Sequence, residues 1–453
     1  MTGSTASAAP PPNVVMVLVD DARLADLSTM PYVSSMIGDA GTTFAQSYAP
    51  FPLCAPDRAT LLTGQYAHNH GVLSNAAPVG GFSVFEDSQT IATWLNPTYE
   101  TGYVGKYMNG YGVDGTSKYV PPGWDEWHAT LTSDIYEGPR FNNNGAARTY
   151  TDQYVTDVVA DMAIDFIDTS AAGPDPFFLV AAFSAPHNGL PVEMDDPEGT
   201  ATPNVGSNPS YANTFSGRPL DKGSSFNERA ITDKPVQPAT LTATDIAALQ
   251  ELDQQRRESL LYVEEAVQDI VATLTAAGEL DNTYIIFTSD NGFLLGEHRL
   301  SGKGTPYQES IGVPLMIRGP GIPAGATVTQ QSGAHDIAPT VLGMTGRTAQ
   351  GGHVIDGVNL LPMISRPSLY ANRPIVLEAG PDGTRPEYAY HGIRTPQWKY
   401  VERSVAAKIE LYDMRNDPFE LVNKAGVARL ASRQAEMQAL LRQYEYCAGT
   451  ACR

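Results

Sequence analysis

The sequence is short of basic residues. It contains 29 Lys and Arg against 50 Asp and Glu, which gives a formal net charge of -21 at pH 7. Nucleic acids and anionic membrane surfaces repel a chain this acidic, so neither is expected as a partner. Any anion that the protein binds must therefore be held by local positive charge.

Long apolar runs are missing as well. The longest cover residues 14–19 and 177–183, far fewer than the roughly 20 residues that cross a bilayer as a helix. Residues 1–12 have neither the basic start nor the apolar stretch of a secretory signal, so we expect a signal that has been removed or none at all. The sequence predicts a soluble protein.

Cysteine is scarce, with three residues in the chain. Cys447 and Cys452 stand close together near the C-terminus, whereas Cys54 stands alone. This spacing predicts one small disulfide and one special thiol. A disulfide favours an oxidising compartment, so we expect a secreted, periplasmic or extracellular protein, with two free thiols in a cytoplasmic protein as the alternative.

The apolar residues that are present alternate between two patterns. With 42% apolar and 17% charged residues, the chain can bury a sizeable core in one large domain or two. Runs typical of buried parallel strands cover residues 13–19, 177–182 and 283–288, and helical patterns cover 152–167 and 250–276. The alternation predicts an α/β fold with a large, mostly parallel sheet flanked by helices.

The pattern changes beyond about residue 365. Residues 388–394 and 398–401 are typical of short strands, and residues 427–444 of a final helix. We therefore predict a catalytic α/β domain over 13–365 and a small C-terminal subdomain over 366–453, with an antiparallel sheet and a terminal helix. Residues 195–234 are rich in Pro, Gly, Asn, Ser and Thr, which predicts a long excursion over the sheet that could shape a pocket.

Polar residues follow each of the three expected strands. Asp20 and Asp21 follow the first, Asp290 and Asn291 follow the third, and His187 comes shortly after the second. One Asp pair would more simply be loop or capping residues. Carboxyl ends of parallel strands meet at one edge of a sheet, however, and four oxygen-bearing side chains there suit Ca²⁺ or Mg²⁺.

Cys54 begins a segment with helical spacing, in which Pro56 suits the first turn. A thiol at a helix N-terminus has a lowered pKa and lies near backbone N–H groups that bind anions, so a cysteine nucleophile is conceivable. A buried structural cysteine is equally compatible. A cysteine-dependent phosphatase loop is excluded, because its arginine stands further from the cysteine than Arg58 does.

The segment Cys54-x-Pro56-x-Arg58, followed by Ala-Thr-Leu-Leu-Thr-Gly, resembles the modification motif of the type I sulfatases of the alkaline phosphatase superfamily. Other segments that resemble this family, in the family's order, are Val19-Asp20-Asp21, Gly105-Lys106-Tyr107, Ala185-Pro186-His187, Thr288-Ser289-Asp290-Asn291-Gly292 and Gly302-Lys303-Gly304-Thr305-Pro306-Tyr307. Residues 67–72 and 105–109 are most similar to the branch that contains N-acetylglucosamine-6-sulfatases. The resemblance implies an alkaline phosphatase-like fold and hydrolysis of a sulfate ester, either an aryl sulfate or a sugar O-sulfate.

The resemblance also implies a role for each matching residue. A formylglycine-generating enzyme oxidises Cys54 to formylglycine, whose hydrate is the nucleophile. The implied ligands of Ca²⁺ are Asp20, Asp21, the modified Cys54, Asp290 and Asn291. Arg58 holds the hydrate, Lys106 and Lys303 bind sulfate oxygens, and His187 protonates the leaving alcohol or phenol. His298 is a further candidate for substrate binding.

Two alternatives remain open. Hydrolysis of phosphate monoesters, diesters or phosphonates would use similar geometry, because these anions are also tetrahedral. An inactive, metal-stabilised anion-binding protein would keep Cys54 unconverted, since Asp57 replaces the small residue that many members have in the motif. Many members also have a histidine where this chain has Met108, so the base for sulfate elimination is unassigned. The net charge favours a small sulfate or an exposed chain end over the interior of a sulfated polymer.

Overall fold

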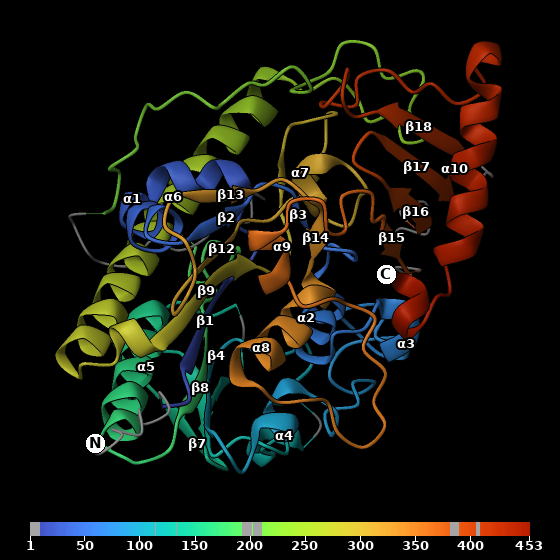
Figure 1. The fold of residues 1–453 in the computed structure, drawn as a ribbon. Coiled ribbons are helices and arrows are strands. Elements are labelled where there is room, and N and C mark those ends of the chain that lie inside the picture. Colours follow the sequence, from blue (N-terminus) through green and yellow to red (C-terminus); the bar gives the residue numbers. More distant parts are fainter. Residues whose placement is uncertain are drawn as a thin grey trace.

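A ten-stranded sheet forms the centre of the protein (Figure 1). The computed structural model describes residues 10–113, 115–132, 134–192, 202, 211–380, 389–404 and 408–453. In spatial order the strands are β13 (Ala326–Val328), β2 (Thr42–Phe44), β12 (Leu315–Arg318), β9 (Thr283–Ser289), β1 (Asn13–Val19), β8 (Phe177–Ala182), β4 (Glu100–Gly105), β5 (Glu126–Thr130), β6 (Arg140–Asn143) and β7 (Ala146–Thr149). Strands β9, β1, β8, β4 and β5 are parallel neighbours, and β12, β6 and β7 run antiparallel to theirs. The predicted mixed, mostly parallel sheet is confirmed.

Helices cover both faces of this sheet, which is why β1 and β8 are buried along their whole length. Val15 and Val17 of β1 face a cluster with α5 (Val155–Ala171) and α6 (Ala243–Ala276). Met16 and Leu18 face the opposite cluster, with α2 (Cys54–Thr63), α4 (Ile91–Leu95) and α8 (Ile337–Thr345). A strand buried on both sides needs a continuous apolar run, and this is the pattern from which β1 was predicted.

A four-stranded antiparallel sheet forms the C-terminal part, as predicted. Its strands are β15 (Ile375–Ala379), β16 (Tyr390–Arg394), β17 (Trp398–Arg403) and β18 (Ile409–Asp413). Helix α10 (Ala431–Tyr444) covers the sheet, and its Met437 and Leu441 pack against Ile393 and Leu411. Cys447 and Cys452 form a disulfide just beyond this helix. The domain boundary at residue 365 stays a prediction.

Shorter elements connect these layers. The helices and turns are η1 (Leu24–Thr29), α1 (Pro31–Val33), η2 (Ser34–Asp39), α3 (Ala67–His70), η3 (Thr116–Lys118), η4 (Leu280–Asn282), α7 (Gln308–Ile311), η5 (Ala334–Asp336), α9 (Leu361–Ser365), η7 (Ala428–Leu430) and η8 (Gly449–Cys452). The short strands are β3 (Ser47–Tyr48), β10 (Leu294–Leu295), β11 (Ser301–Gly302) and β14 (Ser332–Gly333). Among the helices that the structure describes, none is both long and apolar enough to cross a membrane.

The predicted excursion falls partly outside the described residues. Residues 195–201 and 203–210 lie outside them, and residues 211–241 form turns without a helix or strand. Asn227 and His298 connect this stretch to the β10–β11 hairpin, because Asn227 N–H donates to Gly296 O and His298 N–H donates to Ser225 O. The excursion therefore lies against the segment that leads to Lys303.

Candidate active site

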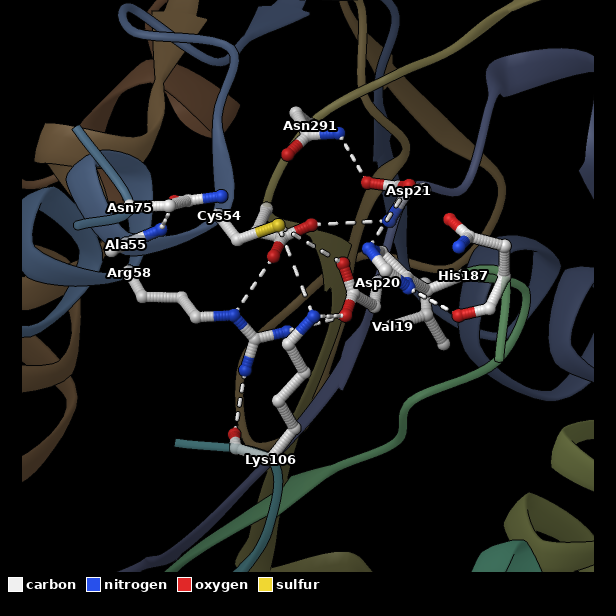
Figure 2. A network of polar contacts seen from close by, with 12 residues as sticks. Val19, Asp20, Asp21, Cys54, Ala55, Arg58, Asn75, Lys106, His187 and Asn291 are labelled. Atoms are coloured by element: carbon white, nitrogen blue, oxygen red, sulfur yellow. Dashed lines mark hydrogen bonds and ion pairs between the residues drawn. The ribbon is translucent and has the colours of Figure 1, made fainter. Parts of the chain in front are cut away.

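An acidic cluster lies at the carboxyl ends of β1 and β9 (Figure 2). The two strands are parallel neighbours, with Val19 opposite Ser289, so the residues that follow them meet. Asp21 N–H donates to Asp290 Oδ1 (3.1 Å), and Asn291 Nδ2 donates to Asp21 Oδ1 (2.6 Å). Carboxylate oxygens of Asp20, Asp21 and Asp290 all lie within 4.8 Å of one another.

This cluster fits a hard divalent cation. Among the described residues, Asp21 Oδ2 and Asn291 Oδ1 are buried oxygens without a hydrogen-bond partner. Burial and the nearby charge of Asp20 raise the pKa of Asp290 to about 6, which indicates that the three acids repel one another. Carboxylate and amide oxygens are the donors that Ca²⁺ and Mg²⁺ prefer, so the donor chemistry suits either ion.

Cys54 is the first residue of α2 and lies beside the acidic cluster. Its Sγ is 3.6 Å from Asp20 Oδ1, 2.9 Å from Lys303 Nζ and 3.8 Å from Lys106 Nζ. The side chain is 0% exposed. Asn75 supports this helix end, because its Oδ1 accepts a hydrogen bond from Ala55 N–H (2.9 Å).

The thiol of Cys54 does not have the lowered pKa that its place at a helix N-terminus predicts. Burial and the charge of Asp20 raise its pKa to about 12, although Lys106 and Lys303 act in the opposite direction. That expectation was wrong, because desolvation of a fully buried thiolate outweighs the helix end. An unmodified Cys54 would be a protonated thiol at neutral pH and a poor nucleophile.

Arg58 connects α2 to the acidic cluster and to the end of β4. It stands one helical turn after Cys54 and points into the same site (Figure 2). Its Nε donates to Asp290 Oδ2 (2.8 Å), its Nη1 donates to Lys106 O (2.6 Å), and its Nη2 lies 3.7 Å from Asp20 Oδ2. Burial alone would lower the pKa of Arg58, but Asp290 and Asp20 raise it, so the guanidinium stays charged.

Two lysines bring further positive charge. Lys106 follows β4 and forms an ion pair with Asp20, and Lys303 follows β11 and forms one with Asp21. Burial would raise the pKa of Asp20, but Lys106 and the other cations nearby hold it well below its usual range. The cations and acids of the site are therefore closely interleaved, and the cations reach the sulfur of Cys54.

His187 faces the same cluster from the segment after β8. Its Nδ1 is 2.7 Å from Asn188 O, which fixes the ring, and its Nε2 is 4.0 Å from Asp21 Oδ2. Tyr136 holds the backbone, because its hydroxyl donates to His187 O (2.6 Å). Burial and the charge of Lys106 lower the pKa of His187. The structure thus brings together predicted residues from α2 and from the ends of five strands, β1, β4, β8, β9 and β11.

Two family models match this chain. The one described as Sulfatase matches residues 12–347, which include every residue of the cluster above, and the one described as N-sulphoglucosamine sulphohydrolase, C-terminal, matches residues 296–446. The chain belongs to the sulfatase family. The resemblance carried by the segment around Cys54 is confirmed.

Curated relatives of this sulfatase support the assignment. An arylsulfatase of Volvox carteri is 32% identical over an alignment 494 positions long, which covers 97% of this chain and 75% of the algal protein. The N-acetylglucosamine-6-sulfatase of Homo sapiens is 33% identical over an alignment 371 positions long, which covers 78% of this chain and 64% of the human protein. The sulfatase described here thus spans less than two thirds of the human relative's length.

Solved structures share the fold of this sulfatase. A protein in complex with its substrate D-glucosamine-2-N,6-O-disulfate superposes with a TM-score of 0.78 at 24% identity, covering 96% of this chain and 98% of that chain. The phosphonate monoester hydrolase of Agrobacterium radiobacter superposes with a TM-score of 0.69 at 23% identity, covering 96% of both chains. At these identities the matches show the fold alone, and they confirm the expected alkaline phosphatase-like architecture.

His298 lies apart from the cluster in this sulfatase. Its side chain is 2% exposed, its Nδ1 is 2.7 Å from Glu228 Oε2, and its ring stacks on Tyr307 with centroids 4.1 Å apart. None of its described contacts is with Cys54, Lys303 or another residue of the cluster. These contacts indicate a structural place for His298 and give no support to direct substrate binding.

Sequence reasoning missed two residues that support the site. Asn75 was missed because it stands in a loop without a helical or strand pattern, and only the fold brings it to Ala55. Tyr103 was missed because it reads as one more buried strand residue, yet its hydroxyl donates to Lys106 O (2.6 Å). Asp57 was singled out, and it is fully buried in α2, where burial and Asp290 raise its pKa well above its usual range.

Proposed function

We propose that this sulfatase hydrolyses a small sulfate monoester, either an aryl sulfate or a sugar O-sulfate such as N-acetylglucosamine 6-sulfate. The observation that carries the proposal is the approach of two lysines to one buried sulfur, with Lys303 Nζ 2.9 Å and Lys106 Nζ 3.8 Å from Cys54 Sγ, next to a cluster of three acids. An anionic ester needs such fixed positive charge where its own charge develops.

The proposed metal is Ca²⁺, and Mg²⁺ is the alternative. The residues that would hold it are Asp20, Asp21, Asp290, Asn291 and the modified Cys54. Once bound, the ion would neutralise the acids and place positive charge beside the ester oxygens. The buried and otherwise unpartnered oxygens Asp21 Oδ2 and Asn291 Oδ1 support this ligand set.

The proposed nucleophile is the hydrate of a formylglycine made from Cys54 by a formylglycine-generating enzyme. The raised pKa of the unmodified thiol, about 12, supports a different chemical group at this position. Arg58 lies one turn after Cys54 in α2, and its guanidinium is fixed by Asp290 and by Lys106 O. It can therefore orient the modified side chain at position 54. A fixed cation beside the nucleophile also stabilises an oxygen that is losing its proton.

Lys106, Lys303 and His187 complete the proposed machinery. The two ammonium groups bind the ester oxygens that do not react, and they offset charge in the transition state. His187 protonates the leaving oxygen through Nε2, since Nδ1 is held at Asn188 O. A lowered pKa makes the protonated ring a stronger acid and also reduces the protonated fraction at neutral pH. The base that removes the proton of the second hydroxyl when sulfate is eliminated is unassigned, because Met108 has no basic group.

Two observations favour a small substrate outside the cytoplasm. The net charge of -21 repels a densely sulfated polymer, so a free sulfate ester or an exposed chain end is preferred. The disulfide between Cys447 and Cys452 suits a secreted, periplasmic or extracellular protein. The names arylsulfatase and N-acetylglucosamine-6-sulfatase among the relatives are consistent with both substrate classes.

The first test is the mass of the tryptic peptide of residues 24–58, which ends at Arg58 and contains Cys54. Conversion replaces the thiol by an aldehyde, with loss of H₂S and gain of one oxygen atom. The proposal predicts the converted mass. An unconverted peptide that stays unconverted after co-expression with a formylglycine-generating enzyme would support the inactive anion-binding alternative, in which Asp57 spoils the motif.

The second test compares matched aryl sulfate, phosphate and phosphonate esters with fully converted protein. We expect kcat/KM for the sulfate to exceed that for the other two. The fold match to a phosphonate monoester hydrolase makes phosphonate the strongest rival substrate. A higher kcat/KM for phosphate or phosphonate would replace the proposal by that alternative, and no turnover of either aryl or sugar sulfates would reject it.

A further inference from the structure

The hairpin that leads to Lys303 has an unusual tip. Strands β10 and β11 pair with Leu294 opposite Gly302, and Leu300 N–H donates to Glu297 O (2.9 Å) across the turn. The two central residues of that turn, His298 and Arg299, both have positive φ, at 52° and 63°. Turns with two such residues join hairpins well, but they strongly prefer Asn and Gly.

Two adjacent residues other than glycine are strained in the left-handed backbone conformation. Such strain persists only where the surrounding structure enforces it. The side chain of Arg299 supplies one part of that enforcement. Its Nε donates to Glu228 O (2.8 Å), its Nη1 to Pro238 O (3.2 Å) and its Nη2 to Arg229 O (3.0 Å). One guanidinium thus binds three backbone carbonyls, two in the excursion and one just beyond it at Pro238.

His298 fixes the other half of the tip. Its Nδ1 contacts Glu228 Oε2, its ring stacks on Tyr307, and its backbone N–H donates to Ser225 O (2.7 Å). The hairpin strands themselves are two residues long, so their ladder contributes few hydrogen bonds. The direction in which the hairpin points therefore depends on how its tip is held.

Lys303 stands at the other end of this hairpin, between two glycines. Gly302 and Gly304 have φ of 102° and 81°, so the backbone around the lysine has little local stiffness. On the far side Gly304 N–H donates to Pro52 O (3.0 Å). The backbone on the two sides of Lys303 is thus held by Gly304 and by the hairpin, while its Nζ lies 2.9 Å from Cys54 Sγ and forms an ion pair with Asp21.

We infer that Arg299 is a positioning residue for sulfate binding: by holding the strained hairpin tip on the excursion, it places the ammonium of Lys303 against the nucleophile. The inference rests on the proposed role of Lys303. It assigns Arg299 no contact with the substrate, and it gives His298 a supporting part in the same anchor.

The test variant is Arg299→Gly. Glycine adopts positive φ freely, so the turn keeps its shape and loses its strain, while the three anchoring hydrogen bonds disappear. We expect kcat/KM for an aryl sulfate to fall by about 10²-fold, the loss that a ~1 Å misplacement of a positioned group causes. If the hairpin needs only the geometry of its turn, and not the hydrogen bonds of Arg299, the Arg299→Gly variant will keep its kcat/KM. That result would overturn the inference.

A double-mutant cycle shows whether Arg299 acts through Lys303. Two quantities are measured: kcat/KM, and the affinity for inorganic sulfate, taken as the sulfate concentration that gives half of the maximal rise in melting temperature. In the Lys303→Ala background, Arg299→Gly should have no further effect on either quantity. Full additivity of the two losses would overturn the inference. If Lys303→Ala alone leaves both quantities unchanged, the proposed function of Lys303 fails instead, and the two failures are distinguishable.

Three further variants complete the design. His298→Asn removes the imidazole but tolerates positive φ, so it tests the anchor if Arg299→Gly does not fold, and we expect a smaller loss in kcat/KM. Lys408→Ala removes a hydrogen bond to Pro235 O, directly after the excursion, and Asp152→Gly relieves a positive φ at an exposed turn. Both should keep the parental kcat/KM; equal losses in these controls would mean that the effect of Arg299 is not specific to the hairpin.

Discussion

Asp290 has two structural partners in addition to its proposed metal. Its Oδ2 accepts the hydrogen bond from Arg58 Nε, and its Oδ1 accepts one from Asp21 N–H. Asp290→Ala leaves the buried guanidinium without its best partner, so we expect a loss of about 3–5 kcal/mol in the free energy of unfolding, together with loss of the bound metal. Urea denaturation and elemental analysis measure the two effects.

The matched control for this variant is Asp281→Ala, which removes an exposed acid before the other end of β9. It should change neither quantity. Unchanged metal content in Asp290→Ala would mean that Asp290 is not a ligand, whatever happens to stability.

Cys54 is the proposed source of the nucleophile, and its small side chain contributes little to the packing. Cys54→Ala removes one sulfur atom from the start of a helix, so we expect turnover to vanish while the free energy of unfolding changes by about 1 kcal/mol or less. Activity on an aryl sulfate and the melting temperature are measured together. A large fall in melting temperature would show that the residue is structural.

Several individual residues could be predicted and others could not. Asp20, Asp21, Asp290 and Asn291 were predictable as a group, because each follows an apolar run and parallel strands deliver their ends to one edge. The raised pKa of Cys54 was not predictable, since it depends on burial and on charges contributed by distant segments. The types and order of the residues thus predict which side chains lie together in the site. Their pKa values depend in addition on burial and on the charges around them in the folded protein.

Helix α6 illustrates the limits of prediction at the level of an element. Its helical pattern was predicted from residue 250, but the helix begins at Ala243. The missed signal is a capping box, in which Thr242 Oγ1 accepts from Asp245 N–H (3.2 Å) and Asp245 Oδ2 accepts from Thr242 N–H (2.8 Å). Helix α5 begins at Val155 and not at 152, because Asp152 has a positive φ of 59°.

This cap gives a prediction for α6. Thr242→Ala should lower the free energy of unfolding by about 1 kcal/mol without changing kcat/KM, because the cap is exposed and remote from Cys54. Thr242→Ser keeps the acceptor oxygen and should restore most of the stability. Equal losses in both variants, measured by urea denaturation, would show that the hydroxyl does not cap the helix.

The central strands were easier to predict than the edge strands. Residues 13–19 were predicted as a strand and form β1, because a long β-branched run has few other ways to be buried. Strands β2, β12 and β13 are three or four residues long and carry little periodic signal. Their mixed directions arise from long-range pairing that a local pattern does not record.

At the scale of the whole molecule, the C-terminus is fastened to the helix that follows the site. His68 of α3 contacts Glu378 of β15 through Nδ1 (2.6 Å) and Cys447 O through Nε2 (2.8 Å). Asn69 donates to the same carbonyl and to Asp356, which in turn accepts from Gly449 N–H. Burial opposes a charge on His68, but Glu378 and Cys447 O outweigh it and raise the pKa above 6.5.

This fastening gives a pH dependence with a definite sign. Because the pKa of His68 is higher in the folded than in the unfolded protein, its contribution to stability is complete below about pH 6.5 and is lost as the pH rises through the folded pKa. Urea midpoints of the parent protein and of His68→Gln, measured between about pH 6 and pH 9, should converge on the alkaline side. Parallel curves would contradict the prediction.

The complete burial of Cys54 also sets an order of events. An enzyme that oxidises this residue cannot reach a side chain that is 0% exposed and enclosed by the ends of β1, β4 and β9 and the loop at Lys303. All of these segments except β1 follow Cys54 in the chain, and the last of them reaches residue 303. The conversion of Cys54 that we propose must therefore take place before these later segments fold around the motif, and a chain that folds first would keep an unconverted thiol.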